Sequence, residues 1–266
     1  MRPAVVVAAL ILLPLAAEAQ RPVRLAGAAV RPAAAAAARI PGGSYLPLYD
    51  RGEGRVRVAA FSLDRLPVTR GDFLAFVRAD STWRRDRVRL LFADERYLAD
   101  WAAPLDAGRG DDLRRPVTHV SWFAAKAYCT WRGGRLPSTD EWEYAAAASA
   151  TRRDASRDEA ELQRLVALYA RPRGDVPPAV GGTPANAYGV RDLHGLVWEW
   201  TRDFNSVLVS DDSRGTAARD TRLFCAGGVV GATNPRNFPA FLRYAFRAGL
   251  DARATIGALG FRCAGA

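Results

Sequence analysis

Lysine is nearly absent from this sequence of 266 residues, because all but one of its 38 lysine and arginine residues are arginine, and Lys126 is the exception. Histidine is almost as scarce, with only His119 and His194. Neither histidine has a metal-ligating partner three or four positions away, and no CxxC, HExxH or EF-hand motif occurs. The chain also lacks a GxSxG turn and a phosphate-binding P-loop. These absences argue against a metal site or a hydrolytic active site of the kind that a short sequence motif encodes.

Blocks of five or six like charges are also missing, although the formal net charge is +10. The arginines are scattered, which is typical of solvated surface residues and not of a nucleic-acid-binding face. With 49% hydrophobic and 10% aromatic residues, the composition is that of a compact domain and excludes a disordered chain. We therefore expect no nucleic-acid partner.

A long apolar run occurs only near the N-terminus. Arg2 precedes the apolar stretch Ala4–Ala16, and the small-x-small pattern AEA follows it, so residues 1–19 are predicted to be a signal peptide. The stretch is too short to span a bilayer, and no later segment has eighteen consecutive apolar residues. The sequence thus predicts a periplasmic or secreted protein without a membrane span.

After the signal peptide, residues 20–39 are of low complexity and are interpreted as a linker, which leaves residues 40–266 as one domain. Alternating side chains over Val56–Leu63 predict a short strand. Residues 80–118 are rich in arginine, aspartate and tryptophan and follow no clear pattern. Capping residues and apolar spacing predict four helices: one after Thr69, one from about Ser121 to Arg132, one after the capping box Ser138–Glu141, and one through Leu162 and Tyr169 that ends before Pro172.

Three segments, taken together and in order, resemble the formylglycine-generating enzyme (sulfatase-modifying factor) family. The first runs from Pro116 to Ala146 and contains HVSW, AYC and RLPSTDEWEYAA; the second runs from Asn186 to Thr201 and contains GLVWEWT. The third pairs Ala226-Gly227-Gly228 with the terminal LGFRCA. The resemblance covers roughly residues 40–264. It implies a single irregular α+β domain, related to C-type lectins, with little regular secondary structure.

The resemblance also implies a disulfide. The family joins the cysteine of its AYC helix to that of its terminal GFRC, and these match Cys129 and Cys263. Such a bridge would close a loop of about 134 residues and would stabilise the fold by about 4–5 kcal/mol in the chain-entropy model. Of the three cysteines, Cys225 then remains unpaired within the chain, as a buried free cysteine or as a reactive or interchain thiol.

A structural calcium ion is a further implication of the resemblance. The family binds calcium around its WEW segment, and the matching positions are the side chains of Asp192 and Glu199 and the backbone carbonyls of Gly195 and Val197. Oxygen ligands of this kind suit Ca²⁺. The alternative is that both carboxylates pair with nearby arginines such as Arg202.

The catalytic centre of the family has no counterpart in this sequence. The family holds Cu(I) between two cysteine thiolates, whose positions fall near Ala232 and Pro239, and no cysteine lies between Cys225 and Cys263. Copper is therefore not expected. The iron-dependent relatives rely on a histidine cluster, which two separated histidines cannot supply.

Within the family, the stretches Phe224–Gly228, Gly231-Ala232 and Ala240–Arg247 resemble exported homologues encoded beside copper-containing nitrite reductases, which are regarded as accessory proteins. The leading hypothesis is therefore an exported, non-catalytic accessory or binding protein that acts on a protein or peptide client, in maturation of a periplasmic reductase. Its oligomeric state is left open.

A client-binding cleft is predicted at three side chains. Trp198 would give a flat contact, while Arg243 and Arg247 would bind a carboxylate; the alternative for the arginines is salt bridges to local acids. Two other functions stay open: an oxidase that modifies a residue of an exported client through an unrecognised metal site, and a calcium-dependent lectin-like binding module.

Overall fold

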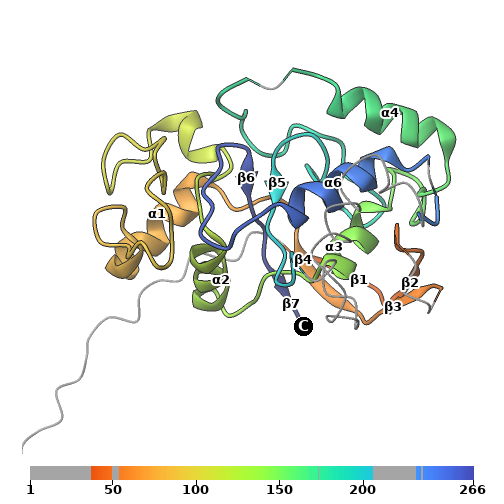
Figure 1. The fold of residues 1–266 in the computed structure, drawn as a ribbon, viewed down its shortest axis with the longest axis horizontal. Coiled ribbons are helices and arrows are strands. Elements are labelled where there is room, and N and C mark those ends of the chain that lie inside the picture. The colour runs from red at the N-terminus through yellow and green to blue at the C-terminus, as the bar shows by residue number, and fades with distance from the viewer. Residues whose placement is uncertain (1–36, 50–53, 173, 206–231, 235) are drawn as a thin grey trace, which may run out of the picture. The chain divides into compact units, whose positions relative to one another are not determined.

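A bent antiparallel ribbon forms the first part of the computed structural model, which describes residues 37–49, 54–172, 174–205, 232–234 and 236–266 (Figure 1). Its strands pair as β1 (Ala37–Ile40) with β4 (Phe61–Asp64) and β2 (Gly43–Tyr45) with β3 (Val56–Val58). At the bend, a Cβ added to Gly42 would lie 3.0 Å from the backbone nitrogen of Ala60, so any larger residue would crowd this close approach. The single strand predicted over residues 56–63 is therefore two strands in two sheets.

The first strand begins before the predicted domain boundary at residue 40. Ala38 and Ile40 face the core, while Ala37 and Arg39 are exposed. Alanine has little preference for strands, but the backbone of β4 provides the hydrogen-bonding partners that hold this segment extended. Residues 37–39, which the sequence assigned to the linker, thus belong to the domain.

Three short strands near the C-terminus complete the sheets. β7 (Ala264–Gly265) pairs antiparallel with β4, which is therefore the central strand of a three-stranded sheet. β5 (Trp198–Glu199) pairs in parallel with β6 (Leu259–Gly260). The end of the chain is in this way fixed to strands that come much earlier in the sequence.

The predicted caps at Thr69, Ser121 and Ser138 are confirmed, since each side chain accepts a hydrogen bond from the amide three residues later. A further helix, following Asn237, was not predicted from the sequence. Residues 80–118 consist of turns and two 3₁₀ helices. The helices are α1 (Arg70–Ala79), η1 (Ser81–Trp83), η2 (Gly110–Arg114), α2 (Trp122–Trp131), α3 (Thr139–Ala146), α4 (Glu159–Tyr169) and α6 (Phe238–Ala248).

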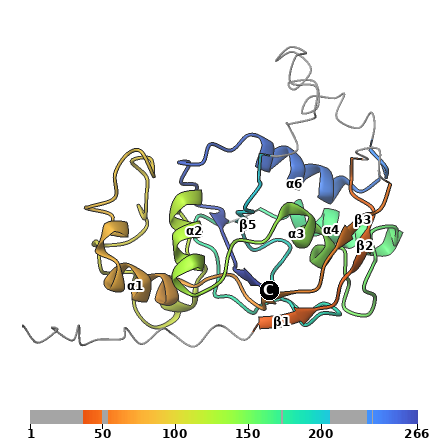
Figure 2. The ribbon, with the colours of Figure 1, turned by 90° about the horizontal axis from the view of Figure 1, so that it is seen from below.

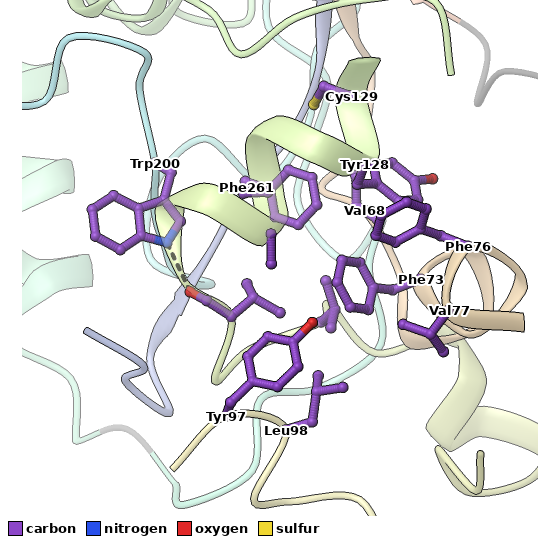
Figure 3. Close-up of a cluster of buried hydrophobic side chains, with 14 of the residues drawn as sticks. Val68, Phe73, Phe76, Val77, Tyr97, Leu98, Tyr128, Cys129, Trp200 and Phe261 are labelled. Carbon is purple, nitrogen blue, oxygen red and sulfur yellow. Dashed lines mark hydrogen bonds between the residues drawn. The ribbon is translucent and has the colours of Figure 1, made fainter. Parts of the chain in front are cut away.

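Aromatic rings fill the core between α1 and α2 (Figure 3). The ring of Phe73 stacks on Tyr128 at a centroid distance of 5.7 Å, and both contact Phe261 edge to face. Trp200 is fully buried, and its indole N–H donates to the carbonyl of Val120 at 2.9 Å. A second cluster lies between α3 and the β1–β4 sheet. The result is an α+β domain with little regular secondary structure, as predicted.

The predicted disulfide is confirmed between Cys129 on α2 and Cys263 in the segment between β6 and β7. Their Cα atoms are 5.5 Å apart and the residues are 134 positions apart in sequence. The bridge therefore ties the C-terminal segment to the aromatic core. None of the helices in the described part of the chain has the length and apolar character needed to cross a membrane.

Candidate functional site

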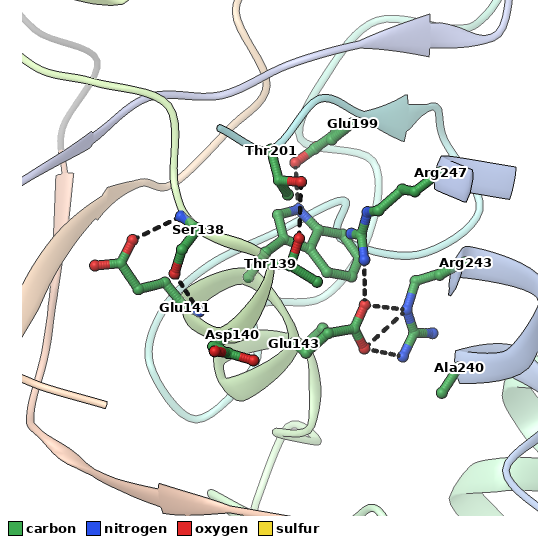
Figure 4. A network of polar contacts seen from close by, with 12 residues as sticks. Ser138, Thr139, Asp140, Glu141, Glu143, Glu199, Thr201, Ala240, Arg243 and Arg247 are labelled. Carbon is green, nitrogen blue, oxygen red and sulfur yellow. Dashed lines mark hydrogen bonds and ion pairs between the residues drawn. The ribbon is translucent and has the colours of Figure 1, made fainter. Parts of the chain in front are cut away.

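A buried ion-pair cluster joins α3 to α6 (Figure 4). Glu143 on α3 accepts hydrogen bonds from two arginines on α6: the distances are 2.7 Å from Nη2 of Arg243 to Oε2, and 2.6 Å from Nη1 of Arg247 to Oε1. Nε of Arg243 lies 3.0 Å from Oε1. All three side chains are at most 6% exposed. Figure 2 shows α6 running beside α3, the arrangement that this cluster maintains.

The charges of this cluster determine the ionisation of Glu143. Burial alone would raise the pKa of a carboxyl group, but Arg243 and Arg247 together lower the pKa of Glu143 to about 2. The same carboxylate raises the pKa of Arg243 against the effect of burial. Glu143 and Arg243 are therefore charged at neutral pH.

Trp142 connects this cluster to a second buried ion pair. The guanidinium carbons of Arg247 and Arg243 lie 4.6 Å and 5.4 Å from the centroid of the Trp142 ring. The indole N–H of Trp142 donates to Oε2 of Glu199 at 2.7 Å. Glu199 in turn forms a two-pronged ion pair with Arg262, with distances of 2.7 Å and 2.8 Å, and neither side chain is exposed.

Arg262 uses all of its guanidinium N–H groups inside the protein. Besides the pair with Glu199, its Nη1 lies 3.0 Å from the carbonyl oxygen of Asp64 and 3.3 Å from that of Arg65. Its Nη2 donates to the carbonyl of Arg191 at 3.0 Å. The side chain thus links the end of β4, the loop before β5 and β5 itself.

These contacts bear directly on the predicted calcium site. Both oxygens of Glu199 already accept hydrogen bonds from Arg262, so a calcium ion at this carboxylate would have to displace a fully bonded, buried cation. Asp192, at a φ of 59°, accepts from the amides of Gly181 and Thr183 and from the Thr183 hydroxyl. The sequence offered two alternatives for Glu199, a calcium ligand or an ion pair with an arginine such as Arg202. The structure shows an ion pair, and its partner is Arg262.

The two backbone positions of the predicted site, Gly195 and Val197, lie in closely packed surroundings. A Cβ on Gly195 would lie 2.7 Å from Cγ of Leu168, so this segment packs closely on α4. Val197 lines a small gap together with Trp198, Phe246 and the buried charged side chains of the network. Within the described ranges, no group of three or more His, Cys, Asp or Glu side chains is placed to hold a metal ion. In this arrangement Glu199 is bonded to Arg262, which argues against calcium at this carboxylate.

The predicted cleft at Trp198, Arg243 and Arg247 also requires correction. Both arginines are buried and form salt bridges with Glu143. This is the alternative that the sequence had left open for them. The ring of Trp198 stacks on Phe246 at 4.7 Å and on Tyr169 at 5.5 Å. Trp198 is half-buried beside these two rings, so only the two arginines are removed from the predicted binding surface.

His194 lies at the edge of the network. Its Nε2 is 3.0 Å from the carbonyl oxygen of Ala146, and its Nδ1 is 3.2 Å from the hydroxyl of Tyr169. Burial and the nearby Arg243 lower the pKa of His194 to about 3, so the ring is neutral at physiological pH.

His194 also lines a groove of about 450 Å³ that runs along α4. Its walls come from three segments: residues 148–151, the N-cap Asp158 with α4 up to Leu168, and residues 183–194. The volume is in the range of ligand-binding clefts. Sequence reasoning did not find this groove, because only the packing of the three segments creates it.

The positions that correspond to the family's copper-binding cysteines carry no sulfur. Ala232 is half-buried and bridges to Tyr49, while Pro239 is buried in the first turn of α6. Cys225, the predicted free thiol, lies outside the described residues. Because Cys129 and Cys263 form the disulfide, Cys225 is the one cysteine of the sequence outside this bridge.

The irregular α+β fold, the disulfide between α2 and the GFRC segment and the WEW strand define a formylglycine-generating-enzyme-like domain. The chain belongs to the family of sulfatase-modifying factor enzyme 1-like domains, whose sequence profile matches residues 23–266. The resemblance found in the sequence is thus confirmed.

Three relatives illustrate the range of this family. The chain is 31% identical over 273 residues to the inactive C-alpha-formylglycine-generating enzyme 2 of Bos taurus, covering 85% of this chain and 86% of that protein. It is 29% identical to the formylglycine-generating enzyme of Thermomonospora curvata, with coverages of 85% and 91%. It is 32% identical to the hercynine oxygenase of Mycobacterium tuberculosis, but over only 55% of this chain and 38% of that enzyme.

A solved structure with a similar fold is that of PvdO from Pseudomonas aeruginosa. The two chains are 21% identical, the TM-score is 0.49, and the match covers 85% of this chain and 92% of PvdO.

Proposed function

We propose that this chain is an exported, non-catalytic member of its family that binds a protein or peptide client, as an accessory protein in the maturation of a periplasmic reductase. The observation that carries the proposal is the use of its cysteines. Two of the three form the Cys129–Cys263 bridge, so at most one thiol remains. One thiol cannot provide the pair of soft sulfur ligands that holds Cu(I) in the catalytic relatives.

The comparison with relatives supports the same proposal. The bovine relative, which the chain covers almost from end to end, is named an inactive enzyme, so loss of activity within this fold has a precedent. Export is supported by the predicted signal peptide and by the disulfide, which oxidising compartments favour. The groove along α4 is the candidate surface for the client, because it is open and lined by both apolar and polar side chains.

Copper binding and oxygen consumption test the absence of catalysis. The purified protein is loaded with Cu(I), challenged with a chelator, and then assayed for oxygen uptake with a cysteine-containing peptide. We expect the wild type to retain no stoichiometric copper. Its oxygen uptake should not exceed that of Cys225→Ser, the matched control for metal bound by the single remaining thiol. Retention of one copper per chain, or peptide-dependent oxygen uptake, would refute the proposal.

The accessory role is tested in the source organism by deleting the gene and measuring the specific activity of the exported reductases. We expect one reductase to lose activity while its polypeptide is still exported. A plasmid copy of the gene should restore it, and so should the Cys225→Ser copy. Unchanged activity of every exported reductase in the deletion strain would contradict the accessory role.

A further inference from the structure

Leu90 and Leu91 are the two most exposed large apolar side chains of the described residues, at 64% and 60%. They lie next to each other in the turns between η1 and η2, in the part of residues 80–118 whose sequence pattern indicated no element. This segment forms the yellow loops beside α1 in Figure 1. Isolated exposed leucines are common, but an adjacent pair without a packing role requires a different explanation.

Half-buried aromatic rings continue from these leucines towards α2. Neighbouring ring centroids in this row are 6.0 Å, 5.5 Å and 5.4 Å apart, and each ring is partly open to solvent. The leucines and rings together are called the apolar patch: Leu90, Leu91, Trp83, Phe92, Phe123 and Trp122.

Cations surround the apolar patch. Arg87 and Arg89 are exposed, and the guanidinium of Arg89 lies 5.8 Å from the Phe92 ring centroid. Lys126, the only lysine in the chain, is exposed and lies 4.9 Å from the centroid of Trp122. None of these three cations forms a salt bridge with a carboxylate of the described residues. The nearest acid in sequence, Asp86, is paired with Arg84 instead.

We propose that the apolar patch docks this protein on the surface of an anionic phospholipid membrane. Leu90 and Leu91 enter the boundary of the acyl chains, the aromatic rings lie at the level of the headgroups, and the cations contact lipid phosphates. Exposed leucine, half-buried tryptophan and phenylalanine, and a basic rim are the combination by which peripheral proteins bind membranes.

A lipid surface fits these observations better than a protein partner does. Protein interfaces need a complementary area of about 800 Å² on each side and are depleted in lysine. The leucines of the patch project from turns, and the only lysine of the chain, Lys126, lies beside its Trp122 ring. A fluid bilayer requires no complementary shape, so two leucines and a few cations suffice for weak, reversible binding.

Vesicle sedimentation of the full-length mature protein tests this proposal. Vesicles of phosphatidylcholine with phosphatidylglycerol should bind the protein, whereas phosphatidylcholine alone should bind it much less, and added salt should weaken the binding. Leu90→Ser/Leu91→Ser should lower the partition coefficient about tenfold or more. Val176→Ser, which changes another side chain that is 53% exposed, should leave it unchanged.

The charge contribution is tested separately. Arg87→Gln/Arg89→Gln should weaken binding and reduce its dependence on salt, whereas the control Arg39→Gln/Arg57→Gln, which removes two exposed arginines from β1 and β3, should have a smaller effect. Tryptophan fluorescence should be quenched by brominated lipids in the wild type and not in the double-leucine variant.

Equal binding of the wild type and the double-leucine variant would overturn the proposal, and so would the absence of binding to anionic vesicles. Binding of the patch to a soluble acidic protein without any binding to vesicles would overturn it as well. Thermal unfolding of each variant checks that the fold is intact, which we expect because the substituted side chains are exposed.

Discussion

At the scale of single residues, the structure is distinguished by buried charged side chains that are paired with each other. Arg262 and Glu199 are the extreme case, since neither is exposed and the arginine donates every N–H to a protein oxygen. Arginine is suited to this role because its planar, rigid set of donors matches a carboxylate and several carbonyls at once. The buried guanidinium provides positive charge beside Glu199 in a segment where the resemblance implied calcium.

Calcium should therefore not stabilise this protein. We expect no rise in melting temperature in excess calcium relative to EDTA, because a ligand that does not bind the native state cannot stabilise it. Differential scanning fluorimetry measures this directly. Glu199→Gln should lower the melting temperature equally in both solutions, because it breaks the pair with Arg262. A rise with calcium that Glu199→Gln abolishes would contradict this expectation.

His194 should make the stability depend on pH below neutrality. Its pKa is about 3 in the folded protein, against an ordinary value of 6.5, so the unfolded chain binds one more proton between these values. Stability should fall as the pH decreases from 6.5 towards 3, at up to about 1.4 kcal/mol per pH unit.

Urea unfolding between pH 7 and pH 5 tests this contribution, because carboxyl groups titrate mainly at lower pH. His194→Gln should lose this slope. His119→Asn, which leaves His194 in place, should keep it; asparagine suits the positive φ of 54° at this position. An identical slope in the wild type and in His194→Gln would show that this group is not responsible.

At the scale of secondary-structure elements, the cluster at Glu143 fixes α6 against α3. Two arginines one helical turn apart on α6 share a single carboxylate, so the helix has one favourable position. Removing the carboxylate would leave two buried cations without a partner, which costs far more than breaking a surface pair.

Glu143→Gln should reduce the free energy of unfolding by about 3–5 kcal/mol at pH 7. The folded pKa of Glu143, about 2, lies below its ordinary value of 4.5, so its contribution is complete above 4.5 and is lost as the pH falls towards 2. The difference between wild type and variant should shrink accordingly. Glu161→Gln, at a solvent-accessible pair with Arg164, should cost less than about 1 kcal/mol at any pH. Equal effects of the two substitutions would contradict the role of the buried cluster.

The elements differ in how far the sequence predicted them. The starts of α1, α2 and α3 depend on a side chain and an amide three residues away, so a local pattern was sufficient. The ribbon bend depends on the contact of Gly42 with Ala60, and α6 is stabilised by Glu143, a residue about one hundred positions away. Local patterns do not contain such contacts.

At the scale of the whole molecule, the disulfide connects the C-terminal segment to the aromatic core across a loop of 134 residues. Because β7 and Arg262 lie in this same segment, the bridge keeps the central sheet and the buried ion pair close to α2. Its effect should therefore be global and should not be confined to the chain end.

Cys129→Ala/Cys263→Ala should lower the free energy of unfolding by about 4–5 kcal/mol, and dithiothreitol should have no further effect on this variant. Reduction of the wild type should bring its stability to that of the variant. Cys225→Ser serves as the control and should retain the sensitivity of the wild type to the reductant. Calorimetry with and without reductant provides the comparison. Unchanged stability after reduction would show that the bridge does not constrain the unfolded chain.

The sequence by itself determined the helix caps, the family and, through that resemblance, the disulfide between Cys129 and Cys263. It also determined the absence of paired thiols at the positions of the copper-binding cysteines, because this follows from residue identity alone. Only the tertiary structure decided which acid each arginine pairs with. Arginines are numerous and alike in sequence, and their partners are chosen by burial and by geometry between segments that are far apart in the chain. For this reason Arg243 and Arg247, expected at a binding surface, are buried on Glu143, and Glu199, expected on calcium, is paired with Arg262.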